Sequence, residues 1–167
     1  MFQKLSVLTL ATLLTMSPVL WALPELDVRS NAFGAVTVAG LPSAPTALIT
    51  TSYTCPALGR LHVLVTGRLS QVSVNHFESW STRLSISRNS VGHASTSRFY
   101  DAPGAFGSVS ASDEQDIALQ SIATCEAGQL VTYRLMGNKA EAAQPSPILN
   151  DATLVLTYIA STSANGG

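Results

Sequence analysis

Charge is scarce in this sequence, and lysine is almost absent. Charged residues make up 11% of the 167 residues, and the only lysines are Lys4 and Lys139. With a formal net charge of −1, the chain has no basic surplus that would attract nucleic acid or an anionic membrane surface. Hydrophobic residues still make up 46%, which is too many for a long disordered chain. We expect a folded protein that does not bind nucleic acid.

Motifs that would indicate an enzyme are missing too. The sequence has no Gly-x-Ser-x-Gly segment and no glycine-rich loop that could cradle a phosphate. A serine nucleophile needs a base placed beside it, and no pattern selects one. The paired carboxylates of a glycosidase have only a loose counterpart in Asp113, Glu114, Asp116 and Glu126. We therefore predict a protein that is not an enzyme, with no catalytic residue and no cofactor.

Only two cysteines are present, Cys55 and Cys125. In an exported chain they are interpreted most simply as one disulfide. It would close a loop of about 70 residues and stabilise the fold by roughly 3–4 kcal/mol. Two free thiols or a metal site are the alternatives. A metal site would need further ligands at suitable spacing, and the three histidines, His62, His76 and His93, show none.

The N-terminus has the three parts of a secretory signal peptide. Lys4 precedes an apolar stretch over residues 5–16, Ser17-Pro18 breaks it, and the small residue Ala22 stands at the expected cleavage edge. A membrane-spanning helix would need about 20 apolar residues, which is more than this run provides. We predict cleavage after Ala22 and a secreted or periplasmic location. Because no second long apolar run follows, we expect no membrane span in the mature chain.

Beyond the signal, apolar and polar residues alternate with the two-residue period of β-strands. Trp80, Leu84 and Ile86, for example, fall on one face of a strand that we expect to point inward. Segments rich in Gly, Pro, Ser and Asn separate such runs. The predicted strands cover residues 35–39, 46–54, 60–74, 80–88, 95–100, 117–125, 130–136 and 151–160, the last apolar enough to be central. Residues 23–33 are expected to be an edge strand or a loose arm.

In the segment with the strongest strand pattern, residues 60–74, the apolar residues change from one face of the strand to the other. Leu61 and Val65 share one face, whereas Val72 and Val74 fall on the other. Gly67 lies between them, and a β-bulge near this glycine would explain the change.

The mature chain is therefore predicted to be one all-β domain, an antiparallel β-sandwich of about 8–10 strands. The predicted divisions are a signal peptide over residues 1–22, an N-terminal arm and linker over 23–45, the sandwich over 46–160 and a flexible tail over 161–167.

Three segments carry a family resemblance. Pro56-x-x-Gly59 leads into an alternating strand, residues 127–135 begin Ala-Gly-Gln and continue with apolar residues at alternate positions, and residues 152–158 form a closing strand. Together they resemble the jelly-roll heads of the tumour-necrosis-factor and complement globular-head superfamily, over about residues 46–160. The resemblance implies a jelly roll of about ten strands, often trimeric, that binds a partner through loops without a catalytic site. The family's usual glycine in the closing strand is lacking here.

Fimbrial subunits provide a second resemblance. They too are exported, disulfide-bearing sandwiches rich in Thr, Ser and Ala, with a tyrosine near the C-terminus where this chain has Tyr158. This resemblance implies a structural or adhesive fibre subunit. Its sandwich would lack one strand, which a neighbour's arm, near residues 23–33, would supply.

Loop histidines and aromatic residues are the candidates for a binding surface. His76 and Phe77 lie in one predicted loop, His93 in another, and Phe99 and Tyr100 at the end of a short strand. If the two histidine loops share one end of the sandwich, they could meet and, with a carboxylate, form a hydrolytic site. Exposed loop histidines are the simpler interpretation, because no metal-like spacing joins them.

Two further groups have simpler interpretations. Asp113, Glu114 and Asp116 offer oxygen ligands for calcium, but no ligand loop of known spacing surrounds them, so a solvated turn is predicted. His62 is expected to be a sheet histidine on the face opposite Leu61.

These observations favour an exported, non-enzymatic binding or interaction protein. Its partner would be a protein or a glycan, and the chain itself could form a homo-oligomer. The alternatives are a pilin-like structural or adhesive fibre subunit and, third, a β-sandwich hydrolase.

Overall fold

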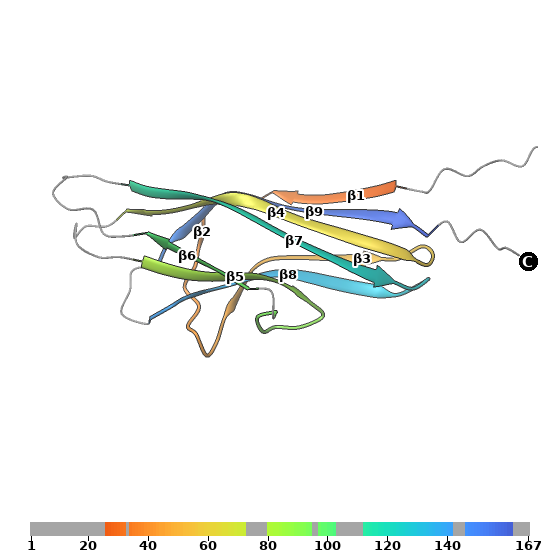
Figure 1. The fold of residues 1–167 in the computed structure, drawn as a ribbon, viewed down its shortest axis with the longest axis horizontal. Coiled ribbons are helices and arrows are strands. Elements are labelled where there is room, and N and C mark those ends of the chain that lie inside the picture. The colour runs from red at the N-terminus through yellow and green to blue at the C-terminus, as the bar shows by residue number, and fades with distance from the viewer. Residues whose placement is uncertain are drawn as a thin grey trace, which may run out of the picture.

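The regular secondary structure in the described part of the chain consists of β-strands joined by turns and loops. This structure is a computed structural model, and it describes residues 26–32, 34–72, 80–94, 97–102, 112–141 and 146–161. Within them lie β1 (Leu26–Ala32), β2 (Val36–Thr37), β3 (Thr46–Thr54), β4 (Gly59–Val72), β5 (Trp80–Arg88), β6 (Arg98–Ala102), β7 (Ser112–Cys125), β8 (Leu130–Lys139) and β9 (Ile148–Ala160). These described residues contain no helix that could cross a membrane. The predicted all-β class is confirmed (Figure 1).

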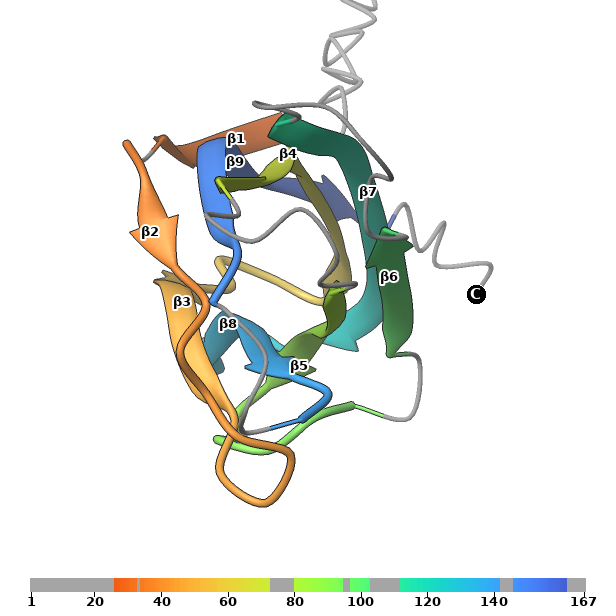
Figure 2. The same cartoon turned by 90° about the vertical axis from the view of Figure 1, so that its left-hand side faces the viewer.

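The strands form two antiparallel sheets. Sheet 1 has the order β1-β9-β4-β7, with the short β2 also paired to β9, and sheet 2 has the order β3-β8-β5-β6. Seen from the end, these two groups of strands make two layers (Figure 2). The layers pack face to face, as the prediction of a β-sandwich requires.

The core between the sheets is built from alternate residues of long strands. Leu61, Val63 and Val65 of β4 are fully buried, as are Leu154 and Leu156 of β9, because successive side chains of a strand point to opposite faces. Each such burial stabilises the fold by about 1.5–3 kcal/mol. Sheet 2 contributes Ile49, Tyr53, Leu84, Ile86, Val131, Tyr133 and Leu135.

The segment predicted as arm and linker takes part in the sandwich. β1 pairs with β9 from Leu26, opposite Ile159, to Ala32, opposite Thr153. β2 pairs with the first part of β9, and Val38 is fully buried in the core. β9 therefore lies inside sheet 1, between β1 and β4. The prediction that the last strand is central is confirmed.

The bulge predicted near Gly67 lies across from it, on β9. The register between β4 and β9 shifts at this glycine, and Asp151 on β9 has a φ of 49°, a left-handed conformation that absorbs the extra residue. β4 itself stays in continuous register with β7, so Leu69 is buried on the same side as Leu61 and Val65. The predicted change of face is therefore wrong as far as the described side chains of β4 extend.

The acidic run predicted as a solvated turn is instead the start of β7. Oxygens of Glu114 and Asp116 lie 3.1 and 3.5 Å from guanidinium nitrogens of Arg68 on the neighbouring β4. These side chains are 48–89% exposed, so each pair contributes at most about 1 kcal/mol. The turn prediction is wrong because a cross-strand arginine lets the charged run continue as a strand.

Cys55 and Cys125 form the predicted disulfide. Cys55 follows β3 of sheet 2 and Cys125 ends β7 of sheet 1, so the bond joins the two sheets at one end. Both cysteines are fully buried. The N–H of Cys55 donates to the carbonyl of Gln129 at 3.0 Å, and its own carbonyl accepts the N–H of Gly128 at 2.8 Å. The disulfide and these two hydrogen bonds hold the β3–β4 connection against the β7–β8 connection.

Replacing both cysteines with alanine should lower the free energy of unfolding by about 3–4 kcal/mol. The bridged residues are 70 positions apart, and the unfolded chain regains the freedom of that loop. Chemical denaturation of the mature chain measures the difference, and the wild-type protein under reducing agent serves as the control. A double variant as stable as the oxidised wild-type protein would contradict this prediction.

Candidate functional site

Three of the five residues predicted to form a binding surface lie in the described part of the chain. His93 follows β5, and Phe99 and Tyr100 belong to β6. His76 and Phe77 lie outside the described residues. The structure brings His93 and Phe99 to the outer face of sheet 2, but it does not bring Tyr100 there.

Tyr100 points into the sandwich, because it alternates with Phe99 along β6. Its side chain is buried, with 8% exposure, and it is hydrogen-bonded to the backbone of Ala118 on β7. Burial raises the pKa of Tyr100, and the hydrogen bond acts in the opposite direction. This tyrosine therefore joins the two sheets instead of offering an exposed ring.

His93 is held against sheet 2 by two hydrogen bonds. Its Nδ1 lies 2.8 Å from Ser85 Oγ, and its Nε2 is bonded to Asn138 Oδ1. Ser85 Oγ also accepts the N–H of Ala94 at 3.2 Å, which leaves its own proton for donation to Nδ1. This pattern selects the neutral imidazole with its proton on Nε2. Because Ser85 and Asn138 are buried, the ring anchors residues 89–94 on the sheet.

The surroundings of His93 favour its neutral form. Burial lowers the pKa of the imidazole from its usual value of 6.5, the hydrogen bond to Asn138 raises it, and the positive charge of Arg83 lowers it again. A protonated ring would also require Ser85 Oγ to accept at Nδ1 instead of donating. Because these surroundings favour the neutral ring, a detached ring binds a proton more readily than the anchored one, so acid favours release of the 89–94 segment.

Ser85, His93 and Asn138 form a chain of hydrogen bonds like the one that activates a serine nucleophile. This chain does not present a nucleophile to a substrate, because Ser85 has no exposed surface. Its Oγ already accepts a backbone N–H. Opening the segment to admit a substrate would carry His93, the base, away from the serine. The geometry favours an anchoring role for the cluster.

Phe99 presents an exposed aromatic ring on the outer face of sheet 2. Its side chain is 60% exposed, and the guanidinium of Arg83, its cross-strand neighbour, lies 5.7 Å from the ring centroid. Arg83 Nε donates to Ser97 Oγ at 2.8 Å, which fixes the guanidinium in place. This cation–π contact contributes about 0.5–1 kcal/mol at an exposed site, so the ring is positioned before any ligand arrives.

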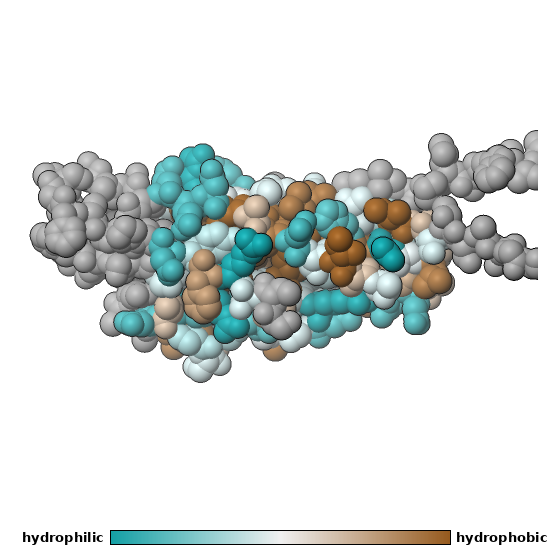
Figure 3. Space-filling view, viewed as in Figure 1, coloured by the Kyte–Doolittle hydropathy of each residue, from teal (hydrophilic) through white to brown (hydrophobic). Residues whose placement is uncertain are grey.

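Apolar side chains project from the outer face of sheet 1. Leu64, Ile122 and Ile159 are 38%, 64% and 47% exposed, and they lie on the neighbouring strands β4, β7 and β9. Ile159 is opposite Arg60 and Ile122 is opposite His62. We call Leu64, Ile122 and Ile159 the apolar face. Figure 3 shows exposed apolar residues between hydrophilic ones on the side of the molecule where β4 and β7 lie.

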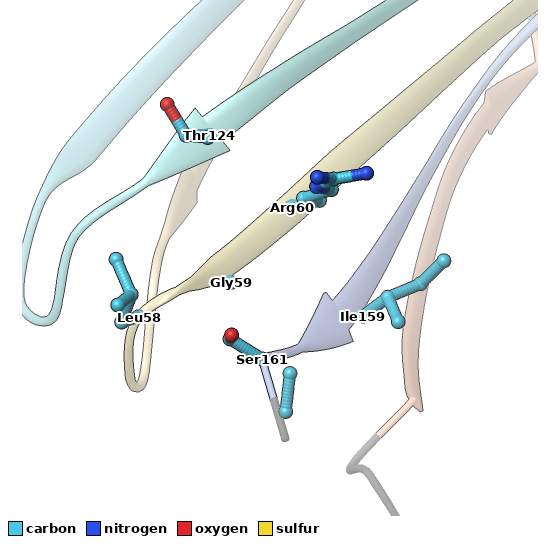
Figure 4. A pocket seen from close by; sticks show the side chains of 7 residues that line it. Leu58, Gly59, Arg60, Thr124, Ile159 and Ser161 are labelled. Carbon is cyan, nitrogen blue, oxygen red and sulfur yellow. The ribbon is translucent and has the colours of Figure 1, made fainter. Parts of the chain in front are cut away.

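A shallow pocket of about 340 Å³ adjoins the apolar face at the disulfide end of sheet 1. Its side chains come from the start of β4 and the ends of β7 and β9 (Figure 4). A Cβ on Gly59 would lie 2.5 Å from the carbonyl oxygen of Ile159, so only glycine fits there. The lining residues are Leu58, Gly59, Arg60, Thr124, Ile159, Ala160 and Ser161. The pocket adds further apolar groups and one guanidinium to the exposed surface at this end of sheet 1.

The described residues contain no group of three or more His, Cys, Asp or Glu side chains that could hold a metal ion. Glu114 and Asp116, considered above as calcium ligands, face Arg68. His62 lies on the outer face of sheet 1, and its Nε2 is buried without a hydrogen-bond partner in the described part of the chain.

Sequence reasoning missed the apolar face, although a signal was present. Leu64 follows Val63 and Ile159 follows Tyr158, so one apolar residue of each pair has to point outward in a strand. Asn138 was missed for another reason. It lies 45 residues from His93, and no periodicity in the sequence connects the two.

No model of a known protein family and no curated protein matches this chain.

Acidification should loosen the 89–94 segment. The pKa of His93 is lowered in the folded chain, so a detached or unfolded ring binds a proton first as the pH falls. The stabilisation by the neutral ring is complete above about pH 6.5 and is lost as the pH falls through the folded pKa. In an NMR titration, His93 should titrate below its ordinary value, and amide exchange at Ala94 should accelerate over the same range.

The variant Asn138→Asp is the control for this effect. A carboxylate beside Nε2 favours the charged ring and raises the pKa of His93, so the segment should stay anchored to lower pH than in the wild-type chain. Titration of wild-type His93 at or above its ordinary value would overturn the assignment.

Proposed function

We propose that this chain is an exported, non-enzymatic binding or interaction protein that contacts its partner through the apolar face of sheet 1. The observation that carries the proposal is the exposure of Leu64, Ile122 and Ile159 on neighbouring strands. The three side chains lie in successive rows of one sheet face, each beside polar residues, and burying them against a partner would gain about 25 cal/mol per Å². Arg60 stands opposite Ile159, so a matching partner surface is apolar with hydrogen-bond acceptors or acidic groups at its rim.

The strand order supports a jelly-roll head. When the two-residue β2 is left out, the strands numbered along the chain have the order 1-8-3-6 in sheet 1 and 2-7-4-5 in sheet 2. We interpret this as the order of an eight-stranded jelly roll, the fold implied by the resemblance to tumour-necrosis-factor and complement heads. That resemblance also implies assembly with identical subunits. The partner of the apolar face is accordingly a second copy, another protein or a glycan.

A photo-reactive amino acid at position 122 should capture this partner in the producing cells. Ile122 is 64% exposed in the apolar face, and Val91 is 73% exposed on the turn after β5, which makes position 91 the matched control. We expect a discrete covalent adduct at position 122 and none at position 91. Mass spectrometry of the adduct distinguishes a second copy from another protein or a glycan.

Substitution tests the same surface quantitatively. Ile122→Asp should weaken affinity for the captured partner about tenfold or more, because a carboxylate would be buried against apolar groups. Val91→Asp should leave the affinity unchanged. Equal capture at both positions, or a partner indifferent to Ile122→Asp, would contradict the proposal.

A fibre subunit is the second candidate, and the position of β1 favours it. β1 is an edge strand near the N-terminal end of the chain, and its pairing partner is β9. In the single chain this edge is filled by the chain's own β1, so the incomplete sandwich expected of a fibre subunit is not found along β9. Exchange of β1 between copies would create the same pairing between neighbours.

The oligomeric state of the mature chain, residues 23–167, separates the two functions. Light scattering after size exclusion under oxidising conditions should show only small closed species and no open-ended polymers, because β1 already fills the edge of sheet 1. Open-ended polymers that vanish when residues 23–32 are deleted would instead support the fibre subunit. A peptide of residues 23–32 added to the shortened chain is the control, and it should restore the lost thermal stability by pairing with β9.

A further inference from the structure

The four edges of the two sheets differ in their protection against pairing with another strand. The edges are β1 and β7 in sheet 1 and β3 and β6 in sheet 2. An unprotected edge is a template for a further strand, and charged side chains or a short edge deter such pairing. β1 carries Asp27 and Arg29. β6 has only five residues and carries Arg98 and Asp101.

Side chains of sheet 2 protect the edge of β7. The hydroxyl of Tyr100 is hydrogen-bonded to the backbone of Ala118. Farther along, Arg88 Nη2 donates to the carbonyl of Thr124 at 2.8 Å. The acidic residues at the start of β7 add like charges that would face one another in a symmetric pair.

β3 has none of these protections along most of its length. It has nine residues with neither a charge nor a proline. Gly40 covers its beginning, because a Cβ there would lie 2.7 Å from Thr46 N. Arg29 approaches from β1, but it lies over the ring of Tyr53, whose side chain is buried in the sandwich. In the described part of the chain, β8 is the strand paired with β3, and the other side of residues 50–54 has no strand beside it.

Thr50, Ser52 and Thr54, which we call the open-edge residues, direct their backbone N–H and C=O groups away from β8. Cys55 turns both of its backbone groups toward the residues that precede β8. In an antiparallel strand these groups alternate in direction from one residue to the next, so the open-edge residues face the other way. Their side chains are exposed.

β8 gives independent evidence for this direction. Thr132 is the cross-strand neighbour of Ser52. Its N–H donates to Asn89 Oδ1 and its carbonyl accepts the N–H of Asn89, both at 2.8 Å. Because the backbone groups of Thr132 point toward the β5 side, Ser52 and Thr132 form a non-hydrogen-bonded pair. The backbone groups of Ser52 therefore point to the free edge.

We propose that the open-edge residues pair, antiparallel, with the same residues of a second copy of this chain. A two-fold axis at Ser52 sets each Ser52 against the other and each Thr50 against a Thr54. Every such pair can exchange two backbone hydrogen bonds, and hydroxyl side chains are favourable cross-strand neighbours. The strand is self-complementary because it carries no charge that the axis would set against its like. The two copies of sheet 2 become one continuous sheet through an isologous interface.

Sedimentation velocity over a concentration series of the mature oxidised chain tests this pairing. The wild-type chain should show a monomer–dimer equilibrium. Ser52→Pro removes an outward N–H from each copy without removing a ladder bond inside the chain. It should raise the dissociation constant of the dimer about tenfold or more. Ser52→Ala, which keeps the N–H, should dimerise like the wild-type chain.

Two oppositely charged variants at position 52 test the dimer even if the proline variant does not fold. Ser52→Lys alone and Ser52→Glu alone should each be monomeric, and an equal mixture should regain the dimer, because only unlike charges then meet at the axis. Ile122→Asp should leave this dimer intact, which separates the edge from the apolar face. A wild-type chain that stays monomeric at every concentration, or a dimer indifferent to both Ser52→Pro and the charge swap, would overturn the proposal.

Discussion

The Cys55–Cys125 disulfide fixes two connections between the sheets at one end of the sandwich, and the register of the core strands depends on it. The disulfide ties the connection from β3 to β4 to the connection from β7 to β8, and Gly59, the first residue of β4, lies opposite Cys125 in the sheet. From that point β4 runs for 14 residues in unbroken register with β7. A slip by one residue would turn every side chain of β4 to the wrong face, so a fixed start decides which residues enter the core.

Local patterns in the sequence contained much of the fold. Alternation marked the long strands, because one face of each lies in the core, and the cysteine count marked the disulfide. The acidic run before Ile117 was misjudged because its strand depends on Arg68, which lies far away in the sequence. The bulge at Gly67 was placed on the wrong strand for a similar reason, since the extra residue belongs to β9. Strand partners and the anchoring of His93 by Asn138 are long-range facts that no local period encodes.

The outer faces of the two sheets differ in polarity and burial. On sheet 2, hydroxyl, amide and imidazole groups satisfy one another beneath the 89–94 segment, so a polar cluster is hidden and the loop above it is held by a neutral ring. On sheet 1, apolar residues occupy outward positions where alternation alone would call for polar ones. Burying polar groups is tolerated when each finds a partner, whereas exposing apolar groups brings no compensation within the single chain. The polar cluster of sheet 2 is therefore satisfied within the chain, whereas the apolar face of sheet 1 is left exposed.

The two long sides of the sandwich are also unlike. On the side of β6 and β7, Tyr100 and Arg88 of sheet 2 reach backbone groups of β7 and so occupy its edge. On the side of β1 and β3, Arg29 reaches across to the ring of Tyr53, and the backbone groups of Thr50, Ser52 and Thr54 face away from β8. A strand added along β7 would have to displace contacts that hold the sheets together. Along β3, no strand of the described part of the chain lies beside the outward groups of Thr50, Ser52 and Thr54. The strand pairing proposed above is therefore placed on the side of β1 and β3.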